Sequence, residues 1–191
     1  MAPLFTSHAA LVVIDMLNDY FDRLPVLAAE RTRLVTSINA LSSGFRQMSQ
    51  PVIWVRQEFK ADLSDAFLDM RRRNIRVTIE GTHGAQLLPE LERAECDAVV
   101  VKKRYSAFYN TNLEEILARV EPAALVLAGI NTHACIRTAA IDAYQRDYDV
   151  ILASECIASY DPVWHEETLR YVDGRIARVM PNGSILAQLA T

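Results

Sequence analysis

The chain has 191 residues, a formal net charge of −4 and 23% charged residues. This length suits one α/β domain with a full hydrophobic core, so we expect a single domain over residues 1–191. The acidic balance argues against a nucleic-acid-binding protein, because phosphate binding needs a basic surface and the run Arg71–Arg73 has acidic neighbours on both sides.

The apolar segments of the chain do not predict a membrane protein. The longest are about eight residues, well below the roughly 20 that a bilayer-spanning helix needs. The first segment, MAPLFTSHAALVVID, lacks the basic region of a signal peptide. The three cysteines, Cys96, Cys135 and Cys156, form no Cys-x-x-Cys pair. We therefore expect a cytoplasmic protein that makes no contact with membranes.

Short β-branched segments alternate with helical stretches along the chain, which is typical of βαβ units. The strand segments are almost continuously hydrophobic, and this indicates a parallel sheet covered on both faces. The predicted strands are 10–14, 52–55, 98–101, 124–128, 150–153 and 176–179, and the predicted helices lie at about 26–48, 112–120, 134–147, 165–173 and 184–190. This order predicts a three-layer α/β/α fold with a six-stranded, mainly parallel, Rossmann-like sheet.

The segment from Gln57 to Arg93 is less regular than the rest. We expect a short helix near 62–73 and a turn at 80–84 followed by another short helix. Such an excursion suits either a cover over the active-site edge of the sheet or a subunit contact.

Three reactive side chains stand at the carboxyl ends of predicted strands. Asp15 ends the first strand, Lys102 ends the third, and Cys135 follows the fourth across the turn 129–133. Ligands bind at this edge of open α/β sheets. Each residue alone has an ordinary alternative: Asp15 as a helix cap, Lys102 as a solvated charge and Cys135 as an inert buried thiol.

Together the three side chains form a chemical unit. Cys135 lies at the predicted start of a helix, where free N–H groups and the helix dipole favour a thiolate, and a nearby ammonium acts in the same direction. We therefore expect Cys135 to have a lower pKa than Cys96 or Cys156. A carboxylate within reach can accept the thiol proton and so activate the nucleophile for amide cleavage.

Four segments around these residues carry further motifs: VVIDMLNDYF, EGTHGAQLLPEL, VVKKRYSAFYNTNLEEIL and LVLAGINTHACIRTAAIDAYQRDYDVILASE. In order and spacing they resemble the isochorismatase-like superfamily of cysteine hydrolases over about residues 9–180. The resemblance implies catalytic roles for Asp15, Lys102 and Cys135. It also implies a cis peptide before Asn131, so that the N–H groups of Asn131 and Cys135 form the oxyanion hole, and it implies a homo-oligomer, either a dimer or a tetramer.

Departures from the family pattern narrow the expected chemistry. Nicotinamidases of this superfamily bind a metal through an Asp-x-His pair after the second strand, but VIWVRQEFKADL contains no histidine. We therefore expect neither a metal nor another cofactor. Isochorismatases often carry Gly at the position of Cys135, so the thiol favours amidase chemistry. Leu17 replaces the family's usual Gln and predicts a drier pocket.

Aromatic residues near the strand ends are candidates for contact with a small-molecule substrate. They are Tyr20, Phe21, Trp54, Tyr105 and Phe108. Core packing is the alternative, above all for Phe21 and Phe108. Arg56 suits either a substrate carboxylate or an ion pair.

The function expected from these residues is hydrolysis of a C–N bond in a small amide, carbamoyl or related substrate through a Cys135 thioester, with Asp15 as general acid and base and Lys102 in support. One alternative is an isochorismatase-type vinyl-ether hydrolase in which Asp15 alone acts as acid. The other is a catalytically idle binding protein of the same fold.

Overall fold

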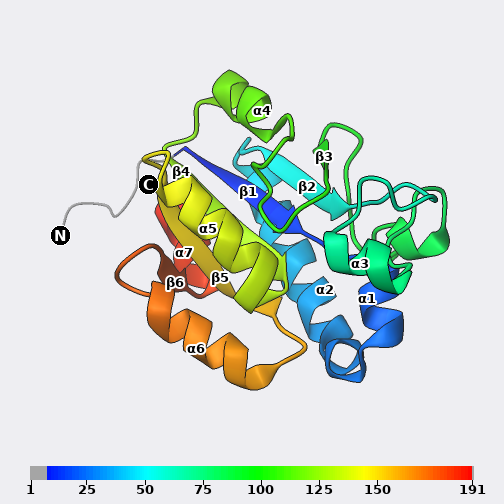
Figure 1. The fold of residues 1–191 in the computed structure, drawn as a ribbon. Coiled ribbons are helices and arrows are strands. Elements are labelled where there is room, and N and C mark those ends of the chain that lie inside the picture. The colour runs from blue at the N-terminus through cyan, green and yellow to red at the C-terminus, as the bar shows by residue number, and fades with distance from the viewer. Residues whose placement is uncertain (1–7, 191) are drawn as a thin grey trace.

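The computed structural model describes residues 8–190, over which strands and helices alternate (Figure 1). The strands are β1 (Ala9–Ile14), β2 (Val52–Gln57), β3 (Ala98–Lys102), β4 (Ala124–Ile130), β5 (Asp149–Ala158) and β6 (Arg178–Met180). The helices are α1 (Asn18–Arg23), α2 (Pro25–Gln47), α3 (Leu68–Arg73), α4 (Leu113–Val120), α5 (Arg137–Tyr144), α6 (Pro162–Val172) and α7 (Asn182–Leu189). The predicted α/β fold is confirmed.

The six strands form one sheet in the order β3-β2-β1-β4-β5-β6, and all neighbouring strands are parallel. The chain builds outward from β1 to β3, returns to place β4 against the other side of β1, and then builds outward again. The order therefore reverses between β1 and β4. Ligands bind at such a switch point, at the carboxyl ends of the strands.

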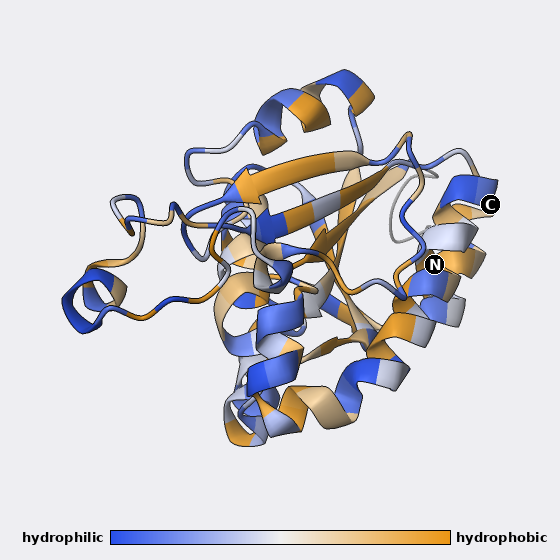
Figure 2. Cartoon of the chain, turned by 90° about the vertical axis from the view of Figure 1, so that its right-hand side faces the viewer, coloured by the Kyte–Doolittle hydropathy of each residue, from blue (hydrophilic) through white to orange (hydrophobic). Residues whose placement is uncertain are grey.

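Helices cover both faces of the sheet and bury two separate hydrophobic clusters. Leu34, Ile38 and Phe45 of α2 pack with Ile185 of α7 on one face. Leu113 and Leu117 of α4 pack on the other face with residues of α5 and α6. Figure 2 shows hydrophobic residues concentrated on the strands and hydrophilic residues on the outer sides of the helices. Each such fully buried Leu, Ile or Phe side chain contributes about 1.5–3 kcal/mol.

In the part of the chain that the structure describes, no helix combines the length and the hydrophobicity needed to cross a membrane.

The segment between β2 and β3 is less helical than we predicted. The first expected helix is only the six-residue α3, which begins at Leu68 rather than near 62. The second is absent from the described residues, where only a 3₁₀ turn forms at His83–Ala85 and overlaps the end of the predicted turn. The physical reason is that hydrogen bonds to α1 hold residues of this segment, where a helix would have made hydrogen bonds within the segment.

The start of α1 provides those contacts. The Asn18 side-chain amide donates to the His83 carbonyl at 3.0 Å, and the Asp19 carboxylate accepts from the Thr78 N–H at 2.6 Å. A Cβ atom at Gly84 would lie 2.3 Å from an Asp19 oxygen, so any larger residue there would displace the Asp19 carboxylate. The motif that follows β1 therefore docks the long excursion beside the carboxyl end of the sheet.

Candidate active site

The structure brings Asp15, Lys102 and Cys135 together at the carboxyl edge of the sheet. The Lys102 Nζ lies 2.7 Å from Asp15 Oδ2 and 3.3 Å from Cys135 Sγ. All three residues are buried, with exposed fractions of 0% for Lys102, 1% for Asp15 and 5% for Cys135. Because β2 separates β3 from β1, only a side chain as long as lysine reaches the carboxylate across it.

The end of β1 fixes the orientation of Asp15. The Asp15 backbone adopts a left-handed conformation with φ of 56°, and its carboxylate accepts from the Gln57 N–H at 2.9 Å. Aspartate tolerates this conformation better than most residues do. A Cβ at Gly129 would lie 2.0 Å from the Ile14 carbonyl oxygen, so a glycine is required where β4 passes the end of β1.

A π-helical turn, Thr132–Ile136, carries the nucleophile and leads directly into α5. The predicted helix start near residue 134 therefore falls within this turn. The Ile130–Asn131 peptide that precedes it is cis. The Tyr160 N–H donates to the Asn131 side chain at 3.1 Å, and the Thr132 hydroxyl pairs with the His165 ring at 2.9 Å. Residues 159–165 thus brace the turn from one side.

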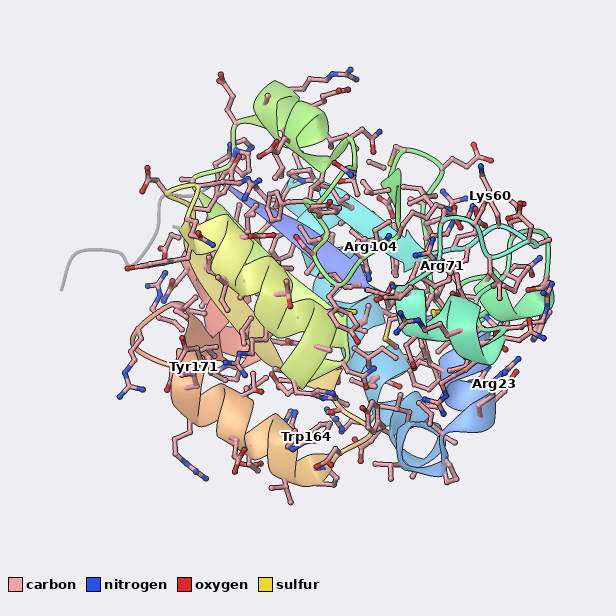
Figure 3. All side chains as sticks on the ribbon, in the orientation of Figure 1. Arg23, Lys60, Arg71, Arg104, Trp164 and Tyr171 are labelled. Atoms are coloured by element: carbon pink, nitrogen blue, oxygen red, sulfur yellow. The ribbon has the colours of Figure 1, made fainter. Side chains whose placement is uncertain are left out.

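His133 takes part in this bracing and is turned away from the thiol. Its Nδ1 lies 2.5 Å from the Ser159 hydroxyl, and its ring contacts those of Tyr160 and Trp164. Figure 3 shows Trp164 and Tyr171 projecting from α6. Burial lowers the pKa of His133, so its imidazole is neutral at pH 7.

The resting charge of Cys135 differs from what the sequence led us to expect. Burial raises the pKa of the Cys135 thiol to about 12; the Lys102 ammonium opposes this shift and the Asp15 carboxylate adds to it. The helix-start argument underestimated desolvation, which disfavours any charged form in the interior. At neutral pH the side chain is therefore a thiol, and its activation requires a base.

Lys102 stays charged in this buried environment. Desolvation by itself lowers the pKa of the Lys102 ammonium, but the negative charge of Asp15 and the contact with Cys135 raise it overall. Lys102 is therefore a fixed positive charge in contact with both Asp15 and Cys135.

One of the predicted substrate-contact residues, Tyr20, lies near Asp15 and Cys135, and Tyr105 lies near Tyr20. The Tyr20 hydroxyl donates to the Gln57 side chain at 2.5 Å. Burial raises the pKa of Tyr20 well above its usual value, and the charges of Asp15 and Cys135 add to the shift. Tyr105 is 51% exposed and its ring packs 4.9 Å from that of Phe67. Sequence reasoning did not single out Gln57, although its place at the end of β2 was a usable signal.

The predicted substrate contacts of Trp54 and Phe108 are wrong. Trp54 packs on the α2 face of the sheet, opposite the face of Cys135, and its indole N–H donates to Asp97 at 2.9 Å. Side chains alternate along a strand, which decides its direction. Phe108 is buried in the core beneath the Arg146 guanidinium, beyond the far end of α5. Phe21 is likewise a core residue.

The assignment of Trp54 to the core predicts a change in stability without a change in substrate affinity. Trp54→Phe should lower the free energy of unfolding by about 1–3 kcal/mol, because it removes buried volume and one hydrogen bond. Urea unfolding measures this loss. A large rise in KM with unchanged stability would return Trp54 to the substrate site.

The segment after β2 does not suit a metal ion. Arg56 pairs with Glu58 at 3.0 Å and is therefore an ion-pair partner in this structure, and the segment VIWVRQEFKADL contains no histidine. Over residues 8–190, no group of three or more His, Cys, Asp or Glu side chains is placed to hold a metal.

We accordingly predict that hydrolysis does not depend on a divalent ion. Dialysis of the purified protein against a chelator should leave kcat and KM unchanged, because the proposed proton transfers use only Asp15 and Cys135. A loss of activity that zinc or iron restored would contradict this prediction.

Comparison with known proteins agrees with this architecture. The family model for the isochorismatase domain matches residues 9–183. An isochorismatase family protein of Desulfovibrio vulgaris is 29% identical and superposes with a TM-score of 0.86 over 96% of this chain and 98% of its own. N-carbamoylsarcosine amidase of Thermoplasma acidophilum is 28% identical, with a TM-score of 0.76 over 92% and 96% of the two chains.

A further relative is a probable inactive nicotinamidase of Arabidopsis thaliana. It is 34% identical over 166 residues, which are 83% of this chain and 84% of that protein. The family model covers most of the chain, and the similarity in structure to the Desulfovibrio protein covers 96% of it. The chain belongs to the isochorismatase family of hydrolases.

Proposed function

We propose that this chain hydrolyses a C–N bond in a small amide or carbamoyl substrate through a thioester on Cys135. The observation that carries the proposal is the position of the Lys102 ammonium, 2.7 Å from the Asp15 carboxylate and 3.3 Å from the Cys135 sulfur. This arrangement combines a nucleophile, a base and a fixed positive charge, which are the components of thiol-dependent acyl transfer. The similarity to an enzyme named as an amidase supports the same reaction class.

The reaction begins with proton transfer from Cys135 to Asp15. The thiolate then attacks the carbonyl carbon of the substrate, and the N–H groups of Asn131 and Cys135 hold the oxyanion. Asp15 returns the proton to the leaving nitrogen, so that ammonia or an amine departs and a thioester remains. Asp15 next deprotonates a water molecule, whose oxygen attacks the thioester, and the released thiolate regains its proton from Asp15.

Because the pKa of Cys135 is raised, the base Asp15 has to remove the thiol proton before the sulfur can attack. A thiol that is protonated at rest is a weak nucleophile, so the proton must leave as the substrate binds. Lys102 compensates the negative charge that passes from the carboxylate to the sulfur, because it contacts both groups. The total charge of the three side chains stays constant during this first step.

Two alternative functions can be distinguished from amide hydrolysis by experiment. A vinyl-ether hydrolase would use Asp15 as an acid and would not need the thiol. A binding protein without activity is the second, and a relative described as probably inactive shows that such members occur in the family. Neither alternative predicts a covalent adduct between substrate and Cys135.

The test is a screen of carbamoyl compounds, aliphatic amides and aromatic amides for release of ammonia or amine, followed by mass spectrometry of the acid-quenched protein. We expect an acyl adduct on the peptide that contains Cys135. Turnover of an amide that is unaffected by alkylation of Cys135 would exclude the thioester pathway.

A further inference from the structure

The ammonium of Lys102 has no capacity left for a substrate. An ammonium group has three N–H donors. In this structure the Nζ atom contacts Asp15 Oδ2 at 2.7 Å, the Arg104 carbonyl at 3.0 Å and Cys135 Sγ at 3.3 Å. Two donors therefore serve the Arg104 carbonyl and the Cys135 sulfur, and the ammonium charge is paired with the Asp15 carboxylate. Although Lys102 is the cation nearest to the nucleophile, it is not free to receive a carboxylate.

Three neighbouring cations in the sequence around β2 and β3 are engaged in contacts within the protein. Arg56 pairs with Glu58 at 3.0 Å, and Lys103 pairs with Asp65 at 3.1 Å. Arg104, which is labelled in Figure 3, donates to the carbonyl of Asp65 at 2.8 Å and to that of Lys103 at 2.6 Å. To receive a substrate carboxylate, Arg56 or Lys103 would have to break its ion pair, and Arg104 would have to turn from the carbonyls that hold it.

The side-chain amide of Gln57, by contrast, provides an uncharged hydrogen-bond donor close to Asp15. Gln57 is 5% exposed, and its side-chain oxygen accepts from the Tyr20 hydroxyl at 2.5 Å. Its side-chain nitrogen is buried and has no hydrogen-bond partner among the described residues. The Gln57 backbone N–H donates to Asp15, which places the residue at the reacting centre. A buried N–H group without a partner is costly, so its natural complement is an acceptor supplied by a ligand.

From these contacts we propose that the site selects an uncharged amide or carbamoyl compound and rejects one with a carboxylate close to the scissile bond. Gln57 determines this specificity by donating a hydrogen bond from Nε2 to a neutral acceptor oxygen of the substrate. Tyr20 positions the Gln57 amide by holding its oxygen. The inference rests on the proposed amide hydrolysis and adds the charge class of the substrate.

The physical basis is the different cost of burying the two kinds of group. A neutral carbonyl oxygen gives up weak hydration and gains one hydrogen bond from Gln57. A carboxylate loses much stronger hydration, and a neutral amide donor does not replace it. Aromatic rings at the edge of the site, such as the partly exposed ring of Tyr105, add no positive charge.

Two alkylating reagents of similar size test the charge preference without any known substrate. Iodoacetamide carries a neutral amide, whereas iodoacetate carries a carboxylate. In both reactions the thiolate sulfur displaces iodide and forms one S–C bond, and the thiol proton passes to Asp15 or to solvent. Cys96, which is exposed, provides an internal control in the same molecule. Peptide mass spectrometry follows the two sites separately.

We expect the ratio of the iodoacetamide rate to the iodoacetate rate at Cys135 to exceed the ratio at Cys96 by about tenfold or more, because only Cys135 reacts in a buried environment. Equal ratios at the two cysteines, or a faster reaction of Cys135 with iodoacetate, would overturn the proposed exclusion of anions.

The Gln57→Leu variant isolates the role of the side-chain donor. Iodomethane, which is neutral and has no acceptor oxygen, reports the availability of the thiolate in each protein. Relative to iodomethane, the iodoacetamide rate at Cys135 should fall about threefold or more in the variant, as expected for one lost hydrogen bond. An unchanged relative rate in a variant with a native circular dichroism spectrum would overturn the role of Gln57.

The alkylation rates do not depend on turnover. Absence of hydrolysis across the amide panel would therefore contradict the proposed function, whereas the rate ratios by themselves decide the charge class. The comparison of wild-type rates also remains decisive if the Gln57→Leu variant fails to fold.

Discussion

Replacement of Cys135 by serine is expected to lower kcat for amide hydrolysis by about 10⁴-fold or more, because loss of the nucleophile removes the covalent pathway. A serine hydroxyl has a much higher pKa than a thiol, so the Asp15 carboxylate cannot deprotonate it to a useful extent. Steady-state kinetics on the best amide from the screen measures the loss, and mass spectrometry should detect no acyl adduct.

Cys96→Ser is the matched control for this variant. Cys96 is exposed and precedes β3, so it lies at the amino end of the strand whose carboxyl end carries Lys102. Its replacement should leave kcat and KM unchanged. A Cys135→Ser protein with a near-normal rate would exclude the thioester mechanism and favour acid catalysis by Asp15 alone.

Replacement of Asp15 by asparagine is expected to slow thioester formation by roughly 10²–10⁴-fold, the range typical of general acid–base catalysis. Asparagine keeps the shape of the side chain but cannot take the proton from a thiol whose pKa burial has raised to about 12. It also leaves Lys102 buried without its carboxylate partner, so circular dichroism must first establish that the variant is folded. A single-turnover measurement then reports the chemical step.

His133→Ala is the comparison that separates the two possible bases. The His133 ring is bound to Ser159 and packed against Tyr160 and Trp164, so its removal should affect the rate much less than Asp15→Asn does. A near-normal rate for Asp15→Asn together with an inactive His133→Ala protein would replace the proposed mechanism with a Cys–His mechanism.

The sequence was sufficient to predict the strand pattern, the parallel sheet and the meeting of Asp15, Lys102 and Cys135. These features depend on local signals. Continuous β-branched runs indicate buried strands, and polar residues directly after such runs must lie at the carboxyl edge of a parallel sheet. The recognisable motifs around the three residues added the reaction class, which the family comparison supports at the level of an isochorismatase-family hydrolase.

Other features depended on which segments become neighbours, and only the tertiary structure decided them. The strand order places β2 between Lys102 and Asp15, and the packing of α2 on one face of the sheet buries Trp54 on that face, away from the site. The pKa of Cys135 follows from the depth of burial, which the helix-start signal does not report. Gln57 gained its proposed role because Tyr20, distant in sequence, occupies one end of its amide and leaves the other free. The local sequence therefore determined which reactive groups the site contains. Their charge states and the proposed specificity depended on the fold, because hydration and hydrogen-bond partners are properties of the packed chain.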